Sequence, residues 1–271
     1  MFKIEDLLNF FDDERVIELV TLSYYISQQE DKELSDKVFE QLLIMKETNP
    51  KLDIVIDTNK DRSFFDPEKN IICMNTFSIP TFFHELTHMF SYSYMQFEEP
   101  VEFSSFKESF ASNKNNMNLM VQLLNLCKKE KDKLVKDSYD NNFDKNTQQS
   151  SQSIQLELIS FMEDIIDSLY DGESFSNGLT SIKDINSYAL KSRGASGHGC
   201  AYFDRTNYQF EEILANYSAI KMIDSSNELF IILKRILGSE FVAFLDSRCE
   251  QISNIYFYQL LIYQFPVLFY L

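Results

Sequence analysis

Glycine and proline are scarce in this sequence, and their scarcity limits the fold classes open to it. The 271 residues include six glycines and five prolines, with no glycine before Gly172 and no proline between Pro100 and Pro266. Both residues interrupt helices, so their absence over long stretches favours long helices and only a small β component. No repeat of 20 to 50 residues is visible.

Positive charge is also scarce. Lysine and arginine together number 25 against 42 acidic residues, which gives a formal net charge of −17. A chain of this charge repels nucleic acids and anionic membranes, so we expect no nucleic-acid partner. An acidic surface suits a basic or neutral protein or peptide substrate, although solubility alone explains the acidity equally well.

Cysteine spacings typical of disulfide frameworks or zinc knuckles are absent. The four cysteines lie far apart and form no CxxC pair; they are Cys73, Cys127, Cys200 and Cys249. This pattern is typical of a reducing compartment. Cys200 lies near the candidate site described below, where a redox-sensitive thiol and a small buried hydrophobe are both consistent with its position.

The two ends of the sequence bear on localisation. Acidic residues near the N-terminus occupy the place of the apolar region of a secretory signal, so we expect a cytoplasmic protein or one delivered to a target cell by another route. Residues 255–271 are almost wholly apolar and aromatic, but two glutamines and Pro266 make them marginal as a membrane span. A packed terminal helix or strand is the first interpretation of this tail, and a membrane anchor the second.

Hydrophobic spacing predicts the order of elements. Two or three amphipathic helices are expected within residues 4–46, and Asn49-Pro50 ends them. Alternating residues predict strands at 52–56 and 71–75, which we expect to pair. The further expected elements are a helix from Pro80, a long helical stretch over about 104–136, a polar mobile loop over 138–153 and a helix over 154–169. The predicted class is α+β, mainly α.

One motif carries chemistry. His84-Glu85-Leu86-Thr87-His88 reads HExxH within the helix expected from Pro80. Histidines four residues apart share a helical face, so both imidazoles can reach one metal ion while Glu85 reaches a water beside it. With three histidines in the chain, chance would produce this motif on the order of a few times in a thousand such sequences. The motif predicts a catalytic zinc site, which needs a third protein ligand from elsewhere.

The metzincin completion of HExxH is not present. It requires a glycine and a histidine at the positions that Ser91 and Tyr94 occupy. Glu212-x-x-Ala215-Asn216, near the start of a helix expected over about 210–223, instead resembles the second signature of the gluzincin clan, the zinc peptidases that include thermolysin and the lethal-factor-like toxins.

The gluzincin resemblance implies a role for each matched residue. Glu212 would be the third metal ligand, Ala215 the small residue that lets two helices approach, and Asn216 a group that orients a ligand histidine from behind. The spacing agrees, because residues four apart on a helix share a face. Glu211 and Asp204 stay open as alternative ligands, and acidic residues at a helix start are also common without any metal.

Gluzincins also place a tyrosine or histidine before the ligand glutamate, where it stabilises the oxyanion of the reaction. The glycine cluster 194–199 precedes Glu212 here and contains the third histidine of the chain, His198. Glycines allow a backbone to approach a site closely. His198 and Tyr202 are therefore the candidate catalytic residues beside Glu85, and Tyr208 is a weaker one.

These observations lead to one expected organisation. We expect a single zincin-like domain, in which N-terminal helices (1–50), a small sheet with the HExxH helix (51–100), a helical insert (101–190) and the third-ligand helix with C-terminal elements (191–271) follow one another. The interval of 123 residues between His88 and Glu212, residues 89–211, is longer than in thermolysin. By analogy, an effector, toxin or phage-associated zincin fits the length and acidity better.

The predicted function is zinc-dependent hydrolysis of peptide bonds in a protein substrate, with Glu85 as general base. Two alternatives remain open. The first is a catalytically inactive zincin-like binding module, against which the intact Glu85 argues. The second is a metal-free interaction protein, in which the aromatic stripes are ordinary core.

Overall fold

The computed structural model describes residues 2–94, 100–140, 150–169 and 206–253. These residues are mainly helical and include one small three-stranded sheet, so the fold class is α+β, mainly α, as predicted. They divide into two compact units. The first comprises the described residues up to 94 with 221–224 and 246–253, and the second comprises 100–140, 150–169, 206–220 and 225–245.

Three helices open the first unit. They are α1 (Ile4–Leu8), α2 (Glu14–Glu30) and α3 (Lys32–Thr48). They match the helices predicted over 4–46, except that α3 continues two residues further. The Asp13 carboxylate accepts a hydrogen bond from the Arg15 amide at 2.8 Å, and Asp31 accepts one from the Leu34 amide at 3.0 Å. Such caps satisfy amide groups that a helix start leaves without a partner, so α2 and α3 begin where an aspartate precedes them.

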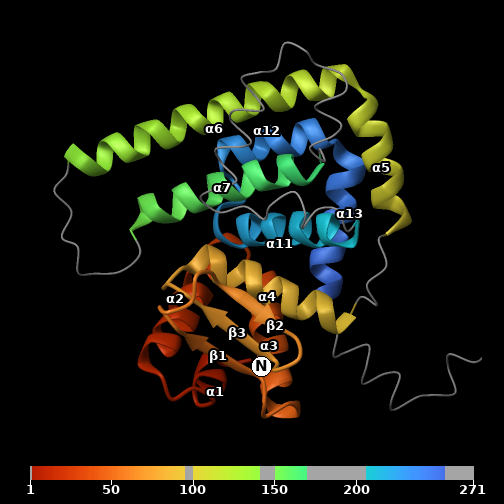
Figure 1. The fold of residues 1–271 in the computed structure, drawn as a ribbon. Helices are drawn as coiled ribbons and strands as arrows, with labels where there is room; N and C mark the ends of the chain where they lie inside the picture. The colour runs from red at the N-terminus through yellow and green to blue at the C-terminus, as the bar shows by residue number, and fades with distance from the viewer. Residues whose placement is uncertain (1, 95–99, 141–149, 170–205, 254–271) are drawn as a thin grey trace, which may run out of the picture. The chain divides into compact units, whose positions relative to one another are not determined.

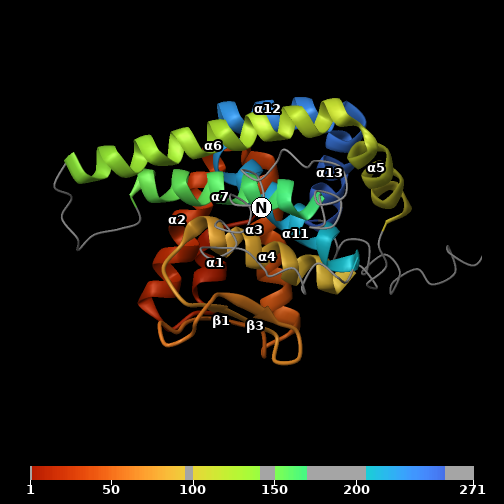
Figure 2. The same ribbon diagram turned by 45° about the horizontal axis from the view of Figure 1, so that its top comes forward.

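A three-stranded sheet follows these helices. Its strands are β1 (Asp53–Ile56), β2 (Phe64–Asp66) and β3 (Ile71–Met74), in the order β1-β3-β2. β1 runs parallel to β3 with Ile54 opposite Ile72, which confirms the predicted pairing of these two segments. β2 runs antiparallel to β3 and was not predicted. Helices α2 and α4 both contact the sheet and lie on the same side of it (Figure 2).

Helix α4 (Ile79–Tyr94) carries the HExxH motif. Ser78 precedes it, and the Ser78 hydroxyl oxygen accepts a hydrogen bond from the Thr81 amide at 3.1 Å. An apolar stripe of Phe82, Leu86 and Met89 is buried, with at most 1% of each side chain exposed. Because α4 contacts β2 and β3, the stripe fixes the rotation of the helix about its axis.

The second unit is helical (Figure 1). It contains α5 (Val101–Ser112), α6 (Lys114–Asp140), α7 (Ser151–Leu169), most of α11 (Thr206–Asp224), α12 (Glu228–Leu237) and the start of α13 (Ser239–Ile252). Helix α6 lies against both α7 and α12. Aromatic rings join α5 to α13 and α11: Phe106 stacks on Phe241 with ring centroids 3.6 Å apart, and Phe103 lies 5.3 Å from Phe210.

Several predicted boundaries in this unit are wrong. The long helix expected over 104–136 is two helices, because the chain breaks at Asn113, whose side-chain oxygen accepts a hydrogen bond from the Asn115 amide at 2.9 Å. Helix α6 continues to Asp140 and α7 begins at Ser151, so the ends of the loop expected over 138–153 are helical. The centre of that loop, 141–149, lies outside the described residues.

The apolar tail, residues 255–271, also lies outside the described residues. In the part of the chain that is described, no helix combines the length and apolar character needed to cross a bilayer.

Candidate metal centre

Helix α4 places the two motif histidines on one face. The Nε2 atoms of His84 and His88 lie 3.0 Å apart, and their ring planes are almost perpendicular at 85°. His84 is buried with 7% of its surface exposed, whereas His88 is half-buried. The two imidazoles therefore direct equivalent nitrogens at one point, as the spacing of four residues predicts.

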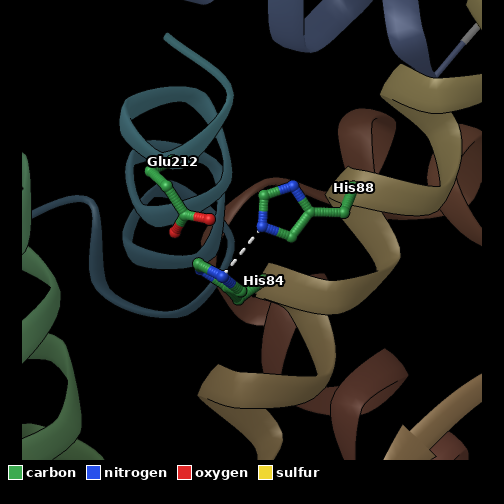
Figure 3. Close-up of side chains that lie close together, drawn as sticks. All are labelled: His84, His88 and Glu212. Atoms are coloured by element: carbon green, nitrogen blue, oxygen red, sulfur yellow. Dashed lines mark hydrogen bonds between the residues drawn. The ribbon is translucent and has the colours of Figure 1, made fainter. Parts of the chain in front are cut away.

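A carboxylate from a distant part of the sequence joins this pair. His84, His88 and Glu212 each offer one ligand atom, and these atoms all lie within 4.8 Å of one another. Figure 3 shows the Glu212 carboxylate and the two rings turned toward the same small region. Glu212 belongs to α11 and is fully buried. Burying a carboxylate costs free energy unless a positive charge, a metal ion or hydrogen bonds compensate for the lost solvation.

The donor set fits a metal ion. Two ligand nitrogens at about 2.0–2.1 Å from a tetrahedral metal are roughly 3.3 Å apart, within a few tenths of an ångström of the observed separation of 3.0 Å. Without metal, the two imidazoles can share a proton in a hydrogen bond whose direction depends on the tautomer. Metal binding requires both Nε2 atoms to be unprotonated. This buried group of His84, His88 and Glu212 could therefore hold a metal ion.

Glu85 lies beside the first histidine on α4 and is 6% exposed. Its negative charge acts on the Cys73 thiol of the neighbouring strand β3. Burial raises the pKa of the Cys73 thiol there, and the negative charges of Asp57 and Glu85 raise it further. Glu85 is thus a buried acid next to the candidate ligands, which is the placement that the HExxH motif predicts for a base.

Asn216 makes a contact that the sequence did not indicate. Its side-chain amide nitrogen, Nδ2, donates a hydrogen bond to the Asp164 carboxylate of α7 at 2.7 Å. Asn216 is 1% exposed and lies one helical turn after Glu212 on α11. No local pattern around Asp164 marks it, because its partner is 52 residues away in sequence.

Some of the alternative metal ligands and catalytic residues lie among the described residues, and others do not. Among the described residues, the group that could hold a metal contains Glu212 and not its neighbour Glu211, which is half-buried. Tyr208 lies in the first turns of α11. His198, Cys200, Tyr202 and Asp204 lie outside the described residues, so their predicted roles stay predictions.

Comparison of the chain with protein-family models, curated proteins and solved structures finds no significant match. The chemistry and geometry of His84, His88 and Glu212 themselves therefore indicate the candidate metal centre.

Proposed function

We propose that this chain is a zinc-dependent metallopeptidase that hydrolyses peptide bonds in a protein substrate. The observation that carries the proposal is the convergence of His84 and His88, from an HExxH helix, with the buried carboxylate of Glu212. The resemblance of the two motifs to those of gluzincins supports it, as does the packing of the HExxH helix α4 against strands β2 and β3.

Zinc is the metal that this donor set suits best. Two imidazoles and one carboxylate form a typical set for catalytic zinc, which keeps one position for water or substrate. All-oxygen sites suit magnesium or calcium instead, and thiolate-rich sites suit structural zinc.

Each residue then has a role. When bound, zinc would act as a Lewis acid that lowers the pKa of a coordinated water to about 7 and polarises the substrate carbonyl. Glu85 would accept the proton of the attacking water and pass it to the nitrogen of the leaving amine. His198 or Tyr202 would donate a hydrogen bond to the developing oxyanion.

The proposed partner and location are inferred from the sequence. A protein or peptide is the partner, because the net charge of −17 disfavours nucleic acid. An effector, toxin or phage-associated peptidase, acting in the cytoplasm of its own or of a target cell, fits the length of the chain by analogy.

Zinc stoichiometry tests the metal site first. Elemental analysis of purified wild-type protein is expected to find one zinc per chain, and the His84→Ala/His88→Ala double variant is expected to contain none. Glu212→Ala should bind zinc more weakly, whereas Glu211→Ala is the matched control on the same helix. Absence of zinc from the wild type, after purification without chelator and after added zinc, would overturn the proposal.

Glu85→Gln tests the chemistry. This substitution preserves the shape of the side chain but removes the base, so zinc should remain bound while cleavage of a denatured-protein or peptide-library substrate falls by at least about 100-fold. Cleavage at the wild-type rate would exclude Glu85 as the base. A wild type that holds zinc but cleaves no substrate in the library would instead indicate the inactive binding module.

A further inference from the structure

The hydrogen bond between Asn216 and Asp164 connects the candidate ligand helix to a neighbouring helix. The donor is Nδ2 of Asn216 on α11, the acceptor is a carboxylate oxygen of Asp164 on α7, and the two atoms are 2.7 Å apart. Asn216 is almost completely buried, and Asp164 is half-buried. A short hydrogen bond to an ionised acceptor is stronger than one between neutral groups, so the bond restrains the Asn216 amide.

The identity of the acceptor decides which way that amide points. An ionised carboxylate can only accept hydrogen bonds, whereas an asparagine amide has a donating NH₂ end and an accepting oxygen end. Asp164 therefore holds the NH₂ end of Asn216 and turns its Oδ1 to the opposite side. A hydrophobic or donating residue at position 164 would not select this orientation.

The orientation matters because of where Asn216 lies. It follows Glu212 by four residues on α11, so the two side chains share a helical face. A metal-bound histidine donates the hydrogen of its other ring nitrogen to an acceptor, which fixes its tautomer and makes it a better ligand. An asparagine can serve this purpose only when its oxygen, and not its NH₂ group, faces the imidazole.

We propose that Asp164 is a positioning residue for the metal centre, acting through Asn216. It holds the amide so that Oδ1 is presented to a ligand histidine. This inference rests on the metal site of the proposed function, and it gives part of the helical insert, α7, a specific role in that site.

Helix α7 offers a matched control. Glu163, the neighbour of Asp164, is 3% exposed and accepts a hydrogen bond from Lys131 of α6 at 2.6 Å. Glu163→Gln thus removes a buried charge and weakens an interhelical contact on the same helix while leaving both Asp164 and Asn216 unchanged in sequence. If zinc binding depended only on general packing in the second unit, substitutions at both positions would weaken it. If Asp164 is a positioning residue, only substitutions at Asp164 weaken it.

Zinc affinity is the main measurement, made by competition with a chromophoric chelator on the full chain. Asp164→Ala should weaken zinc binding about 10-fold, within the range typical of residues that support metal ligands. Asp164→Asn should weaken zinc binding less than Asp164→Ala does, because the carbonyl oxygen of the new amide can still accept from Asn216 but its NH₂ group no longer excludes the opposite orientation. Glu163→Gln should bind zinc as the wild type does, even if its melting temperature falls.

Cobalt(II) supplies a readout that a purely structural role would not change. Its visible absorption reports the geometry of the metal ligands. The spectrum of cobalt-loaded Asp164→Ala should differ from that of the wild type, while the spectrum of Glu163→Gln should match it. Circular dichroism of each variant verifies that the helices are intact.

A charge exchange keeps the proposal testable if Asp164→Ala does not fold. Asn216→Asp places two carboxylates against each other and should weaken zinc binding, whereas the Asp164→Asn/Asn216→Asp double variant restores one donor and one acceptor and should recover most of it. Equal affinities of the single and double variants would overturn the positioning role. An Asp164→Ala variant that binds zinc like the wild type would also overturn the positioning role, but it would leave the proposed function intact. A wild type that binds no zinc would overturn both.

Discussion

Burial distinguishes the acidic residues of this chain from one another. Among the acidic residues that the structure describes, Glu85, Glu163 and Glu212 are the buried ones, each at most 6% exposed. A buried carboxylate needs compensation, which Lys131 supplies for Glu163 at 2.6 Å. For Glu212, the two imidazoles and the proposed zinc are the corresponding partners. The net charge of −17 therefore gives no information about which acids act in a site.

A tyrosine of the first unit carries a pH dependence. The Tyr24 hydroxyl donates a hydrogen bond to Asp36 at 3.0 Å, and burial, that bond and the charge of Asp36 raise the pKa of Tyr24 from 10.0 to about 12. Because the pKa in the folded state lies above the ordinary value, the neutral phenol stabilises the fold fully below pH 10. This contribution is lost as the pH rises from about 10 to about 12.

Tyr24→Phe should therefore abolish a pH-dependent part of the stability. Urea unfolding at several pH values is expected to show the wild type more stable than the variant below pH 10, with a difference that shrinks toward pH 12. Tyr25→Phe, which removes an exposed phenol one position along the chain, is the matched control. A difference between wild type and Tyr24→Phe that stays constant across this range would contradict the prediction.

At the scale of elements, the sequence was most informative where a helix has one buried stripe. The HExxH helix, the β1–β3 pair and the N-terminal helices were predicted because their hydrophobic spacing is regular. Strand β2 was missed because Phe64–Asp66 is too short to show alternation. Its position in the sheet depends on pairing with β3, which is a tertiary interaction.

Helix starts marked by asparagine were also missed, although a local signal was present. The side-chain oxygen of Asn113 accepts a hydrogen bond from the Asn115 amide at the start of α6. That of Asn227 accepts one from the Leu229 amide at the start of α12. Asparagine is among the residues that most favour this position, so the break between α5 and α6 and the start of α12 could have been predicted. Asp164 could not, because its bond to Asn216 exists only once α7 and α11 are packed.

The junction between α12 and α13 depends on one glycine. Gly238 has φ of 86° and ψ of 152°, a conformation that side chains disfavour, and a Cβ atom added there would meet nothing within 4 Å. Gly238→Ala should thus destabilise the protein through backbone strain alone, by about 1–3 kcal/mol. Chemical unfolding measures this loss, and the exposed neighbouring substitution Ser239→Ala is the control. Equal stability of Gly238→Ala and wild type would show that the junction can adopt another conformation.

At the scale of the whole molecule, a bound metal should stabilise the folded chain. The proposed ligands are brought together only by folding, so zinc binds the folded state in preference to the unfolded one. At a free zinc concentration of 100 times Kd, the expected stabilisation is about 2.7 kcal/mol. Differential scanning calorimetry should show a higher Tm with zinc and a lower one with chelator. The His84→Ala/His88→Ala variant should show neither shift, and an equal shift in that variant would place the bound zinc elsewhere.

Each compact unit also contains its own buried thiol. Cys73 lies on β3 in the first unit and Cys127 on α6 in the second, and both are at most 4% exposed. Burial raises the pKa of both thiols, that of Cys127 to about 12, so neither presents a reactive thiolate near neutral pH while its unit stays closed. Alkylating reagents can reach them only through local or global unfolding. Cys73 and the buried Cys249 of α13 thereby report opening of the first unit, and Cys127 reports opening of the second.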